Sequence, residues 1–239
     1  MAGRLLFMSL MKAIAALFSL IYILFFASGA YARSEEELFW LLVDRQLDEK
    51  RVLSEFESHV GNDFEINKRF SSGPTTRDSF LRVAAYRGFT QVTKFLLNHG
   101  ADPNLVLEEK ICSPLGTALM GGHEDVALLL LKNSADTGLP ICWPAEGRNI
   151  SDSVIMYNLS PQMTETIMRR HAELGYDLSP AILHRAIATD NFEFAALYLE
   201  LKPNYRNKKS LTLAKSRSER IYNLLLSSWP ELRSGPFNQ

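Results

Sequence analysis

Two stretches of the chain carry the same pattern. Residues 79–104 read SFLRVAAYRGFTQVTKFLLNHGADPN, and residues 113–136 read SPLGTALMGGHEDVALLLLKNSAD. Three landmarks keep a spacing of 34 positions between the copies: Ala84 and Ala118, Gly88 and Gly122, and Asp102 and Asp136. Because several separate landmarks keep one spacing, the chain contains an internal structural repeat.

Each copy predicts two short helices joined by a tight turn. Ser113 is a good N-cap, and Pro114 occupies the first helical turn, where its missing N–H does no harm. A glycine such as Gly122 then ends the first helix, since glycine adopts the left-handed conformation without strain. The apolar run Val126–Leu131 gives the second helix a broad apolar stripe. One such pair cannot bury both of its faces, so further pairs must stack against it.

The pattern of a T-P-L-H-x-A-like start, a glycine, an apolar helix and G-A-D resembles the ankyrin repeat. The resemblance implies an all-α solenoid of about six helix pairs with short hairpin fingers and degenerate terminal caps. It covers most of residues 35–233, although the motifs are specific only in residues 78–136 and around 183–199. Residues 35–67 resemble a degenerate first repeat. Its Trp40 is either a core residue of the cap or a binding aromatic, and we favour core packing.

The first 32 residues have the pattern of a Sec signal peptide. Arg4 and Lys12 precede an apolar run, and Ala30-Tyr31-Ala32 is an A-x-A cleavage site. We expect cleavage after Ala32, an ankyrin-repeat domain over residues 33–233 and a disordered tail over 234–239. The protein would then be periplasmic, with no membrane contact after cleavage. The alternative is an uncleaved inner-membrane anchor, for which the apolar run is somewhat short.

The composition argues against nucleic-acid binding and against catalysis. The chain has 26 basic and 27 acidic residues, and removal of residues 1–32 takes away two basic ones, which leaves 24 − 27 = −3. Nucleic-acid binding requires a basic face. The five histidines form no H-x-x-H pattern, and no P-loop, G-x-S-x-G or G-x-G-x-x-G motif is present. We therefore expect a monomer that is not an enzyme and that uses no metal or cofactor.

The two cysteines, Cys112 and Cys142, lie in successive predicted fingers. Successive fingers stack side by side, and an exported protein meets an oxidising compartment, so a disulfide between them is favoured. Their separation is four residues shorter than the repeat. The alternative is a pair of small unpaired residues.

The family resemblance implies a non-catalytic scaffold that binds another protein through a concave surface of fingers and first helices. The positions that correspond to this surface, extended by an aromatic residue of the long finger, are Asp78, Tyr86, Arg87, Lys110, Met120 and Trp143. Tyrosine and arginine are enriched in binding hot spots. Two roles remain open: a periplasmic adaptor or accessory protein of an exported enzyme, and an immunity protein that neutralises a delivered toxin. An enzyme is the least favoured class.

Overall fold

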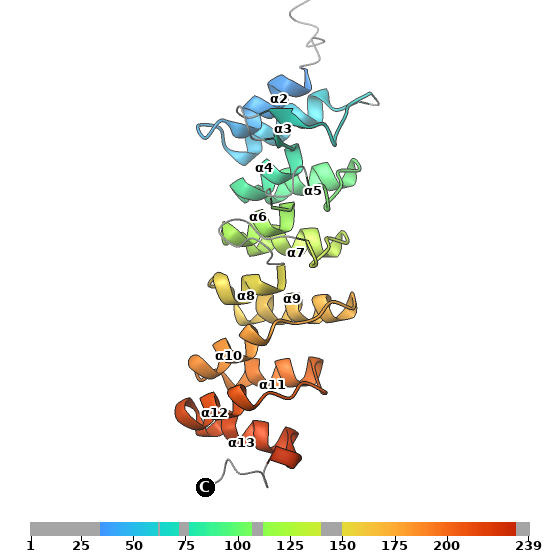
Figure 1. The fold of residues 1–239 in the computed structure, drawn as a ribbon. Helices are drawn as coiled ribbons and strands as arrows, with labels where there is room; N and C mark the ends of the chain where they lie inside the picture. The colour runs from blue at the N-terminus through green and yellow to red at the C-terminus, as the bar shows by residue number, and fades with distance from the viewer. Residues whose placement is uncertain (1–33, 62, 72–76, 107–111, 140–149, 233–239) are drawn as a thin grey trace, which may run out of the picture.

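The computed structural model describes residues 34–61, 63–71, 77–106, 112–139 and 150–232. Over these residues the chain forms six helix pairs, stacked one above another in sequence order (Figure 1). The pairs are α2 (Glu35–Val43) and α3 (Glu49–His59), α4 (Phe80–Arg87) and α5 (Thr90–Asn98), α6 (Pro114–Met120) and α7 (Glu124–Lys132), α8 (Ser153–Met156) and α9 (Pro161–Glu173), α10 (Pro180–Ala188) and α11 (Phe192–Leu201), and α12 (Lys208–Arg217) and α13 (Glu219–Ser228). The expected all-α solenoid of about six pairs is confirmed.

Short elements complete the stack. The strands β1 (Phe70–Ser71) and β2 (Arg77–Asp78) pair antiparallel, with Phe70 opposite Asp78, and form the first hairpin finger. The 3₁₀ helix η1 (Ile150–Asp152) runs directly into α8, and η2 (Pro230–Leu232) follows α13. Within the described residues, no helix is both long enough and apolar enough to cross a membrane.

The local signals for helix ends act as the sequence predicts. Ser79, Ser113 and Ser160 each cap a helix, and their side chains accept a hydrogen bond from the third residue of that helix. Gly88 and Gly122 take φ values of 69° and 73° after the first helices of the second and third pairs. These left-handed residues turn the chain back, so that the second helix packs against the first.

Along the stack, the first helix of each pair packs on the first helices of its neighbours, and second helices pack on second helices. The first helices contact one another from α2 to α12, and among the second helices α3 contacts α5 and α9 contacts α11. The core is continuous through the pairs and includes buried aliphatic and small residues such as Ala84, Ala118 and Ala186. Small side chains at this position let neighbouring first helices approach closely.

Polar side chains add specific links between neighbouring pairs. Glu49, at the start of α3, accepts hydrogen bonds from the backbone N–H groups of Gln91 and Val92 at the start of α5. Glu124, at the start of α7, accepts a hydrogen bond from the backbone N–H of Ser160, the N-cap of α9, with 2.6 Å between Oε1 and the nitrogen. A carboxylate at a helix N-terminus satisfies N–H groups that have no partner within the helix.

Candidate functional site

Exposed apolar side chains gather on the first helices of the first four pairs. Among the described residues, the large hydrophobic side chains with the greatest exposure are Trp40 (53%), Tyr86 (47%) and Met120 (40%), together with Met156, Leu174 and Tyr176. The first four of these lie on α2, α4, α6 and α8, respectively. Isolated exposed hydrophobic residues are ordinary, but a set that recurs on stacked helices marks a candidate interaction surface.

Three of these residues occupy the same position of their pairs. Tyr86, Met120 and Met156 are each the seventh residue of a helical segment that begins at Phe80, Pro114 and Ile150. Because α4 contacts α6 and α6 contacts α8, this shared position forms a line along the stack. We call Tyr86, Met120 and Met156 the apolar column. The exposure predicted for Tyr86 and Met120 from the repeat register is confirmed.

Trp40 corrects the sequence-based interpretation. We favoured core packing for this residue, but its side chain is the most exposed large hydrophobic group of the described residues. The buried position belongs instead to its neighbour Phe39, whose ring stacks on Phe70 with centroids 4.3 Å apart. Trp40 lies edge-on to Phe39 on the outside of α2, and α2 contacts α4. It is therefore a candidate binding residue that the sequence did not select.

Arg87 has a structural role that the sequence did not reveal. Its guanidinium donates hydrogen bonds to the backbone carbonyls of Leu42, Asp44 and Leu47, at 2.9, 2.6 and 2.7 Å. It also lies over the ring of Phe89, 4.2 Å from the centroid. Burial lowers the pKa of this guanidinium, against an opposing effect of Asp44. The side chain holds the α2–α3 turn against α4, and its donors are directed at carbonyls of this chain.

Asp78 is likewise engaged inside the molecule. Only 6% of the residue is exposed, and both carboxylate oxygens bind the guanidinium of Arg82. One of these oxygens also accepts the backbone N–H of Ser79 at 2.9 Å. The structure therefore corrects the expectation that Asp78 presents its carboxylate to a partner. Lys110 and Trp143, the remaining predicted binding residues, lie outside the described residues.

The histidines connect neighbouring pairs. Nε2 of His123 lies 3.1 Å from the carbonyl oxygen of Tyr86, and Nε2 of His184 lies 3.0 Å from Oγ of Ser210. His171 is fully buried, with Nδ1 at 3.0 Å from Oγ1 of Thr137, and burial lowers its pKa. Among the described residues, no cluster of histidine, cysteine and carboxylate side chains could hold a metal ion.

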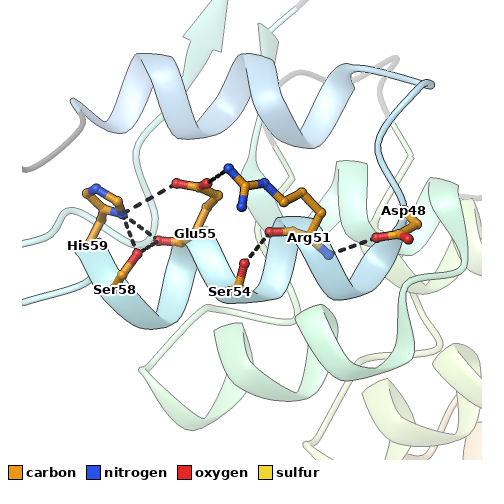
Figure 2. A network of polar contacts seen from close by, with 6 residues as sticks. All are labelled: Asp48, Arg51, Ser54, Glu55, Ser58 and His59. Atoms are coloured by element: carbon orange, nitrogen blue, oxygen red, sulfur yellow. Dashed lines mark hydrogen bonds and ion pairs between the residues drawn. The ribbon is translucent and has the colours of Figure 1, made fainter. Parts of the chain in front are cut away.

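A serine, a histidine and a glutamate do meet on α3 (Figure 2). Oγ of Ser58 lies 2.7 Å from Nδ1 of His59, and the same Nδ1 lies 3.8 Å from Oε2 of Glu55. In a catalytic triad, the serine and the acid bind opposite nitrogens of the imidazole ring. Here both approach one nitrogen, and Glu55 is also paired with Arg51 at 2.7 Å. The arrangement ties together the residues of one helix and does not have triad geometry.

A groove of about 690 Å³ lies between the fourth and fifth pairs. Tyr157, Arg169 and Phe194 are among its lining residues. Arg169 is held at 2.8 Å by Glu165 and at 2.7 Å by Glu200, so this guanidinium already has two carboxylate partners. The groove therefore presents no unneutralised charge at Arg169.

The family model for ankyrin repeats matches residues 31–140, with three copies. This part of the chain consists of ankyrin repeats. The match spans the first three helix pairs, and the last three continue the same stack. A comparison with curated proteins finds no match.

A comparison with solved structures finds 199 matching chains. One similar chain comes from the complex of a predatory endopeptidase of Bdellovibrio bacteriovorus with an immunity protein, and the similar chain is the immunity protein. The TM-score is 0.56 at 19% sequence identity, over 82% of this chain and 99% of that one. At this identity, the likeness concerns the fold.

Proposed function

We propose that this ankyrin-repeat protein is a periplasmic scaffold that binds a partner protein through the first-helix face, with the apolar column and Trp40 at the centre of contact. The observation that carries the proposal is the recurrence of large exposed apolar residues at one position of successive first helices. Aromatic residues and methionine are enriched at the cores of protein interfaces. The periplasmic location rests on the signal-type pattern of residues 1–32.

Site-specific photocrosslinking in the cell of origin tests this function and identifies the partner in the same experiment. A photoreactive amino acid at Tyr86 or Met120 is expected to capture one protein, which mass spectrometry then identifies. The matched control places the same group at Lys94, an exposed position on the second helix α5. Capture of that protein from Lys94 alone would place the interface on the opposite helices and would refute the proposal.

Alanine substitution then measures the contribution of the apolar column. The double change Tyr86→Ala and Met120→Ala is expected to weaken binding by roughly 2 kcal/mol or more, about thirtyfold, as for truncated hot-spot residues. Both side chains are largely exposed, so the melting temperature should change little. A variant that melts normally and binds as tightly as the wild type would show that the partner uses another surface.

A second candidate is an immunity protein that neutralises a toxin by direct binding. The fold-level likeness to an immunity protein in a complex with an endopeptidase is consistent with this role. The crosslinked partner separates the two roles. If it is a hydrolase whose activity falls when this protein is added, the immunity role holds; if its activity is unchanged, the adaptor role holds.

A further inference from the structure

The last helix pair carries a large excess of positive charge. Residues 202–232 contain seven basic and two acidic residues, a balance of 7 − 2 = +5, within a chain whose formal charge is −1. The first pair, residues 34–71, carries five basic and ten acidic residues. The charge of the molecule therefore changes sign from one end of the stack to the other.

The structure neutralises some of these cations and leaves others unpaired. Lys202 pairs with Asp177, and Arg206 pairs with Glu231 at 2.7 Å. Helix α12 differs, because it holds four basic residues and no acidic one. Of these, Lys209, Lys215 and Arg217 are exposed and make no ion pair among the described residues.

A terminal repeat needs a polar outer face, and that requirement explains part of this pattern. Lys215 in α12 occupies the position that Ile187 occupies in α10. Ile187 is buried there. At this position a polar residue is expected, because the described stack ends with the sixth pair. A polar outer face does not require charges of a single sign. The first pair, at the other end of the stack, has both acidic and basic residues. A surface of one sign favours a partner of the opposite sign.

The cationic helix also continues the proposed binding face. Ala214 aligns with Ala118, so Ser216 and Arg217 take the positions of Met120 and Gly121 on the first-helix face. The apolar residues of this face lie on α2, α4, α6 and α8, and Arg217 follows on α12. A partner that lies along the first helices would meet apolar side chains first and basic side chains at the far end.

We propose that the exposed face of α12, through Lys209, Lys215 and Arg217, docks an acidic region of the partner protein. This inference rests on the proposed function and specifies its partner: a protein with an acidic segment beside an apolar one. The attraction acts over about 10 Å at 0.1 M salt, so it increases the association rate and falls as salt rises.

The test uses the purified protein without residues 1–32 and a fluorescein-labelled deca-glutamate peptide as the acidic probe, followed by fluorescence anisotropy at low ionic strength. The triple change Lys209→Glu, Lys215→Glu and Arg217→Glu is expected to weaken peptide binding about tenfold or more. The control reverses three exposed lysines on second helices, Lys50→Glu, Lys94→Glu and Lys132→Glu, with the same change in net charge. It is expected to alter binding by less than about threefold.

Two results would overturn the proposal. Equal losses in the two triple variants would mean that only net charge matters and that α12 is no specific surface. Binding to vesicles of phosphatidylcholine and phosphatidylglycerol that depends on α12, without binding to the peptide, would assign the face to a membrane. Thermal melting of each variant shows that it is folded. The crosslinks from Tyr86 and Met120 test the first-helix interface separately, so either idea can fail while the other stands.

Discussion

The side chain of Asn104 joins its own turn to the turn of Asp136, with 2.7 Å between Oδ1 of Asn104 and the backbone nitrogen of Asp136. The same amide donates from Nδ2 to the carbonyl oxygen of Ser134 at 3.1 Å. One pair earlier, Asn67 makes the equivalent two bonds, to the backbone nitrogen of Asp102 and to the carbonyl of Gly100. Asparagine provides a donor and an acceptor on one planar group, which matches a backbone N–H and C=O on the adjacent turn.

We therefore expect Asn104→Ala to weaken the contact between the second and third pairs. Two hydrogen bonds of about 1 kcal/mol each are lost, so the free energy of unfolding should fall by roughly 1–2 kcal/mol. The melting temperature should then drop by about 2–8 °C. Thermal denaturation followed by circular dichroism measures it. Asn98→Ala, at an exposed helix end, is the control, and an equal drop in that variant would show that the bridge contributes nothing specific.

Arg87 is expected to affect stability more strongly than binding. Arg87→Ala removes three hydrogen bonds to carbonyls at the end of α2 and in the α2–α3 turn, so we expect a loss of roughly 2–3 kcal/mol in the free energy of unfolding. Arg87→Lys should not restore it, because one ammonium group cannot reproduce the planar fork of the guanidinium. Arg45→Ala, in the same turn, is the control. A normal melting temperature for Arg87→Ala, combined with a loss of partner binding, would return this residue to the interface.

The contrast between Tyr86 and Arg87 shows what the sequence could predict. Repeat spacing fixed which helix position each residue occupies, and the exposure of Tyr86 followed from that position. The side chain of Arg87 is instead bound by backbone carbonyls 40 to 45 residues earlier in the chain. These carbonyls lie in a degenerate repeat with a turn of irregular length. Spacing within a repeat cannot reveal a bond between repeats of unequal length.

The prediction that Trp40 is a core residue was wrong for a related reason. The run Leu38–Val43 is apolar on every side of its helix, so its periodicity does not distinguish the buried face from the exposed one. The burial of Phe39 depends on Phe70 and Phe80, which come from the first finger and the next pair. For Asp78, the finger position suggested exposure, but an arginine four residues later pairs with it.

His171 is expected to make stability depend on pH. Its imidazole is buried between the third and fourth pairs, where Thr137, Tyr176, Asp136 and Asp152 surround it, and burial lowers its pKa below the ordinary value of 6.5. The unfolded chain therefore binds the proton more readily than the folded one. The stabilisation is complete above about pH 6.5 and is lost as the pH falls from there through the lower folded-state pKa.

Melting temperatures at about pH 7.5 and about pH 5.5 test this expectation, since the ordinary histidine pKa lies between them. The wild type should lose stability between the two, and His171→Gln should lose less, because glutamine cannot be protonated. His99→Gln, at an exposed position, is the control. If wild type and His171→Gln show the same pH dependence, another group is responsible.

The exported form is expected to begin at Arg33. Ala30-Tyr31-Ala32 after an apolar run is the pattern that signal peptidase cleaves. N-terminal sequencing of the protein from a periplasmic extract should yield Arg-Ser-Glu-Glu. Recovery of the protein in the membrane fraction with residues 1–32 intact would instead support the anchor. Replacement of Ala30 and Ala32 by bulky residues should block cleavage and provide the matched control.

The last prediction concerns Cys112. This residue is buried and disulfide-bonded, and its sulfur lies 3.1 Å from Oγ1 of Thr117 in α6. The chain contains two cysteines, and Cys142 lies outside the described residues, so the pairing with Cys142 remains a prediction. Such a bridge would close a loop of about 30 residues and stabilise the protein by about 3 kcal/mol in the chain-entropy model.

Reduction should therefore lower the melting temperature by roughly 6–12 °C. The double change Cys112→Ala and Cys142→Ala is the control: it should melt near the reduced wild type and should not respond to a reductant. Thiol labelling of the unreduced, denatured wild type should find no reactive group, and a non-reducing gel should show a monomer. Two reactive thiols per chain would exclude the bridge. A reducible dimer would mean that Cys112 pairs with a second copy instead.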